Sequence, residues 1–126
     1  MKFEHYALNV LDSVAVADWY AKHCRMKIVK AIEVEPHTRF LADSTGRVVL
    51  EVYSNRAVEM PDFPNMDSLE YHLAFAVDDP EAERQRLQEA GARFEESVQP
   101  SEGTKLIMMR DPFGMALQLC HRSEPL

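Results

Sequence analysis

Two histidines, a glutamate and a glutamine recur at one spacing in this chain. His5 lies 46 positions before Glu51, and His72 lies 46 positions before Gln118. Two imidazole nitrogens, one carboxylate and one amide oxygen suit Zn²⁺, Ni²⁺, Fe²⁺ or Mn²⁺ and leave coordination positions for water or a substrate. The pattern predicts that His5, Glu51, His72 and Gln118 ligate a divalent transition metal. It does not choose among these ions.

The two pairs belong to a longer internal repeat with an offset of 67 positions. At this offset HYALNV (5–10) matches HLAFAV (72–77), Asp12 matches Asp79, and LEV (50–52) matches LQL (117–119). Matches in register over half the chain indicate a duplicated structural unit. Each half shows the periodicity of one strand, one helix and then three strands.

The predicted fold class is therefore α+β, with two βαβββ modules. Asp12 is the expected N-cap of the first helix, Pro80 begins the second helix, and Gly91 ends it. The modules are expected at 1–54 and 69–122 of a single domain, joined by a linker without an element at 55–68. Strands are predicted at 2–10, 26–33, 37–43 and 47–54, and again at 70–77, 93–98, 104–110 and 115–121.

Strand alternation places the four polar residues on faces that carry small side chains. In the first strand His5 shares a face with Ala7, and in the fifth His72 shares a face with Ala74 and Ala76. The bulky opposite faces are expected to pack on the helices. Because protein interiors are closely packed, an alanine-lined face indicates space that is kept for a ligand. A buried Glu51 would also need a cation or a partner.

The composition limits the kinds of molecule that the protein is expected to bind. The chain is 46% hydrophobic and 28% charged, which is typical of a globular protein. The formal charge of −7 argues against nucleic acid or an anionic membrane and leaves a small molecule as the expected partner. With no apolar run near the roughly 20 residues of a membrane span and no signal-peptide pattern, a cytoplasmic location is expected. Cys24 and Cys120 are expected to be reduced and mostly buried.

These residues resemble the vicinal-oxygen-chelate superfamily, which includes glyoxalase I, bleomycin-resistance proteins and dioxygenases. The resemblance rests on the motifs HYALNV, Trp19-Tyr20, Leu50-Glu51-Val52, His72 and RDPFG at 110–114. Small bacterial glyoxalase I is the most similar group. The resemblance implies a cupped mixed sheet, a homodimer and metal ligands at His5, Glu51, His72 and Gln118. It also implies substrate contacts at Asn55, where that family helps to hold glutathione, and at Asn9, which replaces an arginine.

The resemblance implies a metal-dependent enzyme whose small substrate chelates through two adjacent oxygens, with Glu51 as the proton-transfer group. Gln118 stands where that family usually has a glutamate, and this argues against lactoylglutathione lyase activity. Two alternatives remain open. His5, His72 and Glu51 match the two-histidine, one-carboxylate set of an Fe²⁺ dioxygenase. A non-catalytic protein that binds a drug or metabolite is the other alternative.

Overall fold

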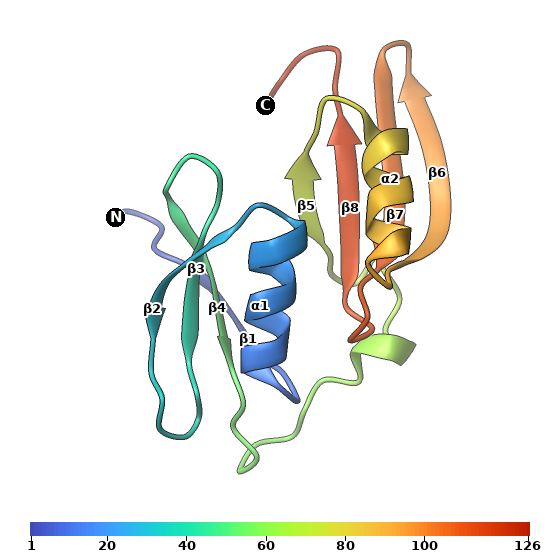
Figure 1. The fold of residues 1–126 in the computed structure, drawn as a ribbon. Helices are drawn as coiled ribbons and strands as arrows, with labels where there is room; N and C mark the ends of the chain where they lie inside the picture. The colour runs from blue at the N-terminus through green and yellow to red at the C-terminus, as the bar shows by residue number, and fades with distance from the viewer. The chain divides into compact units, whose positions relative to one another are not determined.

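The computed structural model describes all 126 residues and divides them into two units, Met1–Pro61 and Asp62–Leu126. Each unit is described on its own below, and each contains a helix and a four-stranded mixed sheet (Figure 1). The α+β class and the two βαβββ modules predicted from the sequence are therefore confirmed.

The same topology occurs in both units. In the first, the strand order is β1-β4-β3-β2, with β1 parallel to β4; in the second it is β5-β8-β7-β6, with β5 parallel to β8. The first unit contains β1 Tyr6–Asn9, α1 Ser13–His23, β2 Lys27–Ala31, β3 Arg39–Ala42 and β4 Val48–Tyr53. The second contains the 3₁₀ helix η1 Phe63–Asn65, β5 Leu73–Ala76, α2 Pro80–Glu89, β6 Arg93–Ser101, β7 Thr104–Arg110 and β8 Ala116–His121.

The parallel strand pairs reproduce the sequence repeat residue by residue. Ala7 is paired with Glu51 across β1 and β4, and Ala74 is paired with Gln118 across β5 and β8. The repeat in the sequence is therefore a repeat of strand register. This register places Glu51 and Gln118 at equivalent positions of the two sheets.

Both helices begin where the sequence predicts. The Asp12 carboxylate accepts a hydrogen bond from the Ala15 amide at 2.9 Å, and the Asp79 carboxylate caps α2 in the same way. Gly91, with φ of +94°, follows the C-cap of α2 as expected. Neither helix has the length and apolar character that a membrane span needs.

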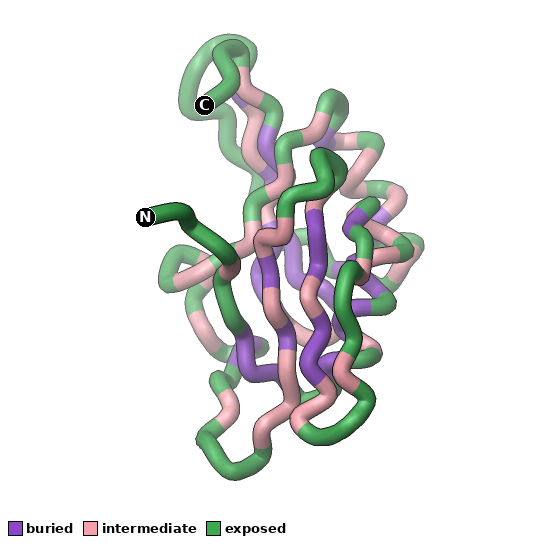
Figure 2. Tube along the Cα trace, turned by 90° about the vertical axis from the view of Figure 1, so that its left-hand side faces the viewer, coloured by how far each residue is buried: buried purple, intermediate pink, exposed green.

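One face of each sheet packs on the helix of its own unit. The helix α1 contacts β2, β3 and β4, and α2 contacts β6, β7 and β8. Figure 2 shows buried stretches along the strands and exposed connections between them. The fully buried large side chains of these cores are Val16, Tyr20, Leu41, Val52, Leu87, Ile107, Met109, Met115 and Leu117.

Three predicted strands differ from the structure by three residues or more at one end, and four others differ by one or two residues. β1 begins at Tyr6 and β5 at Leu73, so His5 and His72 lie immediately before their strands. In the β1–β4 register, Lys2 and Phe3 would lie beside Gly46 and Arg47, which precede β4 and offer no ladder partner. β6 continues to Ser101 because pairing of Ser101 with Thr104 extends its hairpin with β7.

The predicted linker 55–68 contains η1, so the expectation that it holds no element is wrong. The cause is a long-range contact. The buried Arg110 guanidinium donates hydrogen bonds to the carbonyls of Phe63 at 2.9 Å and Met66 at 2.7 Å, and its Nε lies 2.6 Å from the Glu95 carboxylate. The second half of the predicted linker is thereby held on the second sheet.

We expect Gly114→Ala to destabilise the protein more than Gly46→Ala. Both glycines have positive φ, +87° and +84°, so each substitution places alanine in the left-handed region at a cost of about 1 kcal/mol. A Cβ at Gly114 would also meet Pro64 Cγ at 2.5 Å, whereas a Cβ at Gly46 meets nothing within 4 Å. The expected loss for Gly114→Ala is about 3 kcal/mol by urea unfolding. Equal losses would contradict this packing of η1.

Candidate functional site

The first pair of predicted ligands lies together in the first unit. His5 precedes β1, Glu51 lies in β4, and the His5 Nε2 atom is 2.9 Å from the Glu51 Oε2 atom. The two side chains are 25% and 19% exposed. They are therefore sheltered but within reach of a ligand. Such a pair can offer two donors to one metal ion or exchange a proton.

An aromatic ring fixes the orientation of this pair. The Phe40 ring meets the His5 imidazole edge-on, with centroids 5.5 Å apart, and Phe40 is paired with Glu51 across β3 and β4. The Glu4 carboxylate is 2.9 Å from His5 Nδ1, yet Nδ1 makes no hydrogen bond, so the direction of this contact is unfavourable. Because the Glu4 side chain is 82% exposed, we attribute the orientation of His5 to Phe40 and Glu51.

The second histidine is held in the form that metal ligands adopt. His72 Nδ1 lies 2.9 Å from the carbonyl oxygen of Ser68. A carbonyl only accepts hydrogen bonds, so Nδ1 carries the proton and Nε2 keeps a lone pair. A backbone carbonyl on the other ring nitrogen is a common support for a metal-binding histidine.

Gln118 lies in β8 at the position equivalent to Glu51. Its Oε1 atom accepts a hydrogen bond from the Cys120 thiol at 3.1 Å. Burial raises the pKa of Cys120, and the nearby Arg122 opposes this only in part. The thiol therefore stays protonated at neutral pH and can act as the donor. Neither cysteine forms a disulfide; Cys120 is buried and Cys24 is half-buried.

The donor chemistry fits a divalent metal, but neither unit supplies a whole ligand set. No group of three or more His, Cys, Asp or Glu side chains is placed to hold a metal ion. The first unit offers an imidazole beside a carboxylate, and the second offers an imidazole with a free lone pair and an amide oxygen. Ligation by His5, Glu51, His72 and Gln118 together stays a prediction.

The two asparagines expected at the substrate are bonded to each other. The Asn9 side chain is 8% exposed; its Nδ2 donates to the Asn55 carbonyl at 3.0 Å, and its Oδ1 accepts from the Asn55 amide at 2.8 Å. The Asn55 side chain accepts from the Ala57 amide at 2.9 Å. Asn9 thus fastens the chain after β4 to the end of β1. Substrate contacts by either residue stay a prediction.

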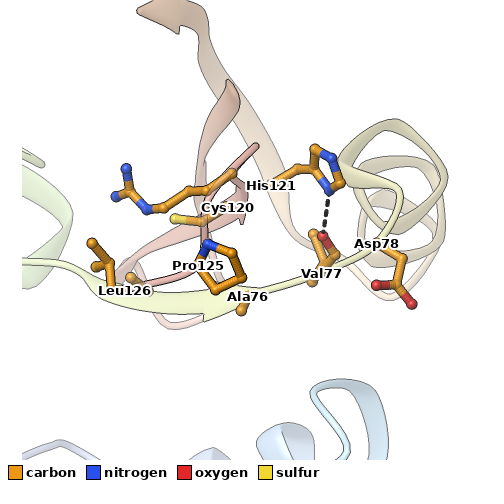
Figure 3. A pocket seen from close by; sticks show the side chains of 9 residues that line it. Ala76, Val77, Asp78, Cys120, His121, Pro125 and Leu126 are labelled. Atoms are coloured by element: carbon orange, nitrogen blue, oxygen red, sulfur yellow. Dashed lines mark hydrogen bonds between the residues drawn. The ribbon is translucent and has the colours of Figure 1, made fainter. Parts of the chain in front are cut away.

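A cavity that the sequence did not locate lies at the carboxyl ends of β5 and β8 (Figure 3). Its volume is about 550 Å³. Ala74 and Ala76 line it, in agreement with the space expected along the alanine-bearing face. The alternation of small residues was the only sequence signal for it. The full lining consists of Ala74, Ala76, Val77, Asp78, Cys120, His121, Arg122, Pro125 and Leu126.

The chain was compared with known protein families. The sequence model of the Glyoxalase/Bleomycin resistance protein/Dioxygenase superfamily matches residues 2–119. The chain belongs to this superfamily. The resemblance to vicinal-oxygen-chelate proteins is thereby confirmed, and with it a family whose members bind small molecules and commonly use divalent metals. No curated protein matches the chain significantly.

Solved structures of the superfamily share the fold over nearly the whole chain. A glyoxalase family protein from Enterococcus faecalis is 25% identical, with 95% of this chain and 97% of that chain covered and a TM-score of 0.69. The fosfomycin resistance protein FosX from Listeria monocytogenes is 12% identical, covers 98% and 94%, and has a TM-score of 0.72. The antibiotic-binding protein TnmS3 from Streptomyces sp. CB03234 is 19% identical, covers 94% and 93%, and has a TM-score of 0.64.

We expect neutral His72 to carry its proton on Nδ1 in the folded protein. The Ser68 carbonyl stabilises that tautomer because it can only accept a hydrogen bond. Long-range ¹H–¹⁵N spectra at pH 8 report the protonated nitrogen of each imidazole. The urea-unfolded protein is the control, since it lacks the Ser68 contact. A folded protein with His72 protonated on Nε2 would contradict this arrangement.

Proposed function

We propose that this protein is a metal-dependent enzyme that acts on a small substrate through two adjacent oxygens. The observation that carries the proposal is the 2.9 Å contact between His5 Nε2 and Glu51 Oε2, because it joins an imidazole and a carboxylate that are both partly accessible. The strand register gives His72 and Gln118 the equivalent positions in the second module. The proposed ligands are His5, Glu51, His72 and Gln118, and the metal is Zn²⁺, Ni²⁺, Fe²⁺ or Mn²⁺.

When bound, the metal supplies Lewis-acid stabilisation of negative charge on the substrate oxygens. Glu51 is the only carboxylate among the four residues, so we assign to it the removal and return of the proton on the carbon beside those oxygens. Its Oε2 atom is held by His5 Nε2, which orients the carboxylate. Gln118 contributes a neutral amide oxygen and transfers no proton. This division of roles supports isomerase or lyase chemistry.

We also propose a homodimer in the cytoplasm. Superfamily resemblance supports the dimer, and two-fold dimers are the commonest soluble oligomers. The two free cysteines are in keeping with a reducing compartment.

Specific observations favour two other functions. The absence of a carboxylate at Gln118 and the cavity beside Ala74 and Ala76 favour a non-catalytic protein that binds a drug or metabolite. The histidines His5 and His72 with Glu51 favour an Fe²⁺ dioxygenase, since they make up its usual ligand set. The metal content and the reaction of the purified protein separate these alternatives from the proposed enzyme.

We expect the protein purified without chelators to hold about one divalent transition metal per chain, and His5→Ala with His72→Ala to abolish it. The double substitution removes both imidazoles of the proposed set. His23→Ala is the matched control, because His23 packs beside the Trp19 ring at 5.4 Å and should leave the metal content unchanged. Elemental analysis measures all three proteins. Full metal content in the double variant would refute the proposed ligands.

We expect the natural protein to convert the methylglyoxal–glutathione adduct poorly, and Gln118→Glu to tighten metal binding and raise isomerase activity. A glutamine amide has no useful basicity near neutral pH, whereas glutamate has a reference pKa of about 4.3 that a site can tune. Both proteins are assayed on the adduct with Ni²⁺, Zn²⁺ and Mn²⁺ in turn. Gln118→Asn is the control that keeps an amide. Efficient turnover by the unmutated protein would show that Glu51 alone suffices.

A further inference from the structure

The cavity at the carboxyl ends of β5 and β8 contains a positive charge that no acidic side chain neutralises. We propose that this cavity binds a small organic anion with an apolar body, and that the anionic group pairs with the Arg122 guanidinium. The inference rests on the proposed function, for which it names the substrate class: an organic acid whose oxygen-bearing end extends along β8 toward Gln118.

The size and lining of the cavity suit such a ligand. Its volume of about 550 Å³ lies within the usual range of small-molecule pockets, roughly 300–1,000 Å³. Ala76, Cys120, Pro125 and Leu126 lie on one side, whereas Asp78 and His121 lie on the other (Figure 3). The side chains of the first group present carbon and sulfur, so an apolar body can rest among them.

Arg122 is the one unpaired cation of this lining. It is half-buried and has no ion pair or hydrogen bond. Its side chain lines the cavity, which places its charge there. Elsewhere in the chain Arg39, Arg84, Arg86 and Arg110 each have an acidic neighbour within 4.0 Å.

None of the other polar groups of the lining takes the place of an anion beside Arg122. Asp78 has the only acidic side chain there, and in Figure 3 it lies on the opposite side of the view from Cys120. His121 Nδ1 is 3.3 Å from the Val77 carbonyl, so this nitrogen is already bonded to the backbone. The Cys120 thiol donates to Gln118. An incoming anion is therefore the missing partner of Arg122.

Comparison of the two modules shows why the cavity is open in the second. At the repeat offset of 67, Ala76 corresponds to Asn9 and Arg122 corresponds to Asn55. In the first module the Asn9 side chain occupies this position and makes two hydrogen bonds, of 3.0 and 2.8 Å, to the backbone of Asn55. In the second module a methyl group and a cation stand there instead. The substitutions leave a space and supply a charge for an anion.

The test uses benzoate and its neutral isostere benzamide, titrated into ¹⁵N-labelled protein and followed by NMR. We expect benzoate to shift the amide signals of 74–78 and 120–122 and to bind about tenfold more tightly than benzamide, because a charge-assisted hydrogen bond to Arg122 favours the carboxylate. Arg122→Gln should abolish this preference. Arg93→Gln, which removes the same charge from β6, should preserve it. Ala76→Leu should block both ligands by filling the cavity.

Equal affinities for the two compounds, shifts confined to other residues, or an unchanged preference in Arg122→Gln would overturn the proposal. The titration is repeated with excess EDTA to separate Arg122 from a bound metal. Retained benzoate binding supports the Arg122 site, even if the proposed metal site fails. Binding that disappears with EDTA would assign the carboxylate to a metal and overturn the role of Arg122.

Discussion

The parallel pairing of β1 with β4 and of β5 with β8 is the constraint on which the rest of the structure depends. Parallel neighbours cannot be joined by a hairpin, so a helix and two strands separate them in the chain. Residues far apart in sequence, such as Ala7 and Glu51, thereby become neighbours. A slip of one residue would turn Glu51 toward the helix and expose Leu50 and Val52, which are 3% and 0% exposed. Burial of the apolar face therefore fixes the strand register, and with it the positions of the residues on the polar face.

The duplicated frame carries different chemistry in its two halves. The first module has a carboxylate at Glu51 and closes the neighbouring position with the Asn9–Asn55 bonds. The second has a neutral amide at Gln118 and leaves the equivalent position open beside Arg122. Along each strand the residues of the polar face alternate with the apolar residues that pack on the helix. A substitution on the polar face therefore changes little in the core. The two modules therefore share one frame and differ in the polar groups that this frame carries.

Local signals predicted much of this fold, and long-range contacts account for what they missed. β7 has its predicted bounds at Thr104–Arg110, and both helix starts follow from capping residues whose partners lie within three positions. The late start of β5 depends on where β8 begins, and η1 depends on Arg110, which is 47 positions from Phe63. For the site, alternation predicted the alanine-lined face. It could not show that Asn9 is bonded to Asn55 or that Arg122 has no acidic neighbour.

The positions of Gln118 and Arg122 constrain the length of a substrate that would use both. Four residues of extended strand span about 13 Å at about 3.3 Å per residue. Long, flexible side chains at both ends shorten this gap, but two adjacent oxygens at Gln118 still lie several bonds from an anion at Arg122. A three-carbon dicarbonyl reaches only one of the two residues. The substrate that would reach both residues is therefore an extended acid, with its anionic group distant from the oxygens and an apolar segment between them over Ala76.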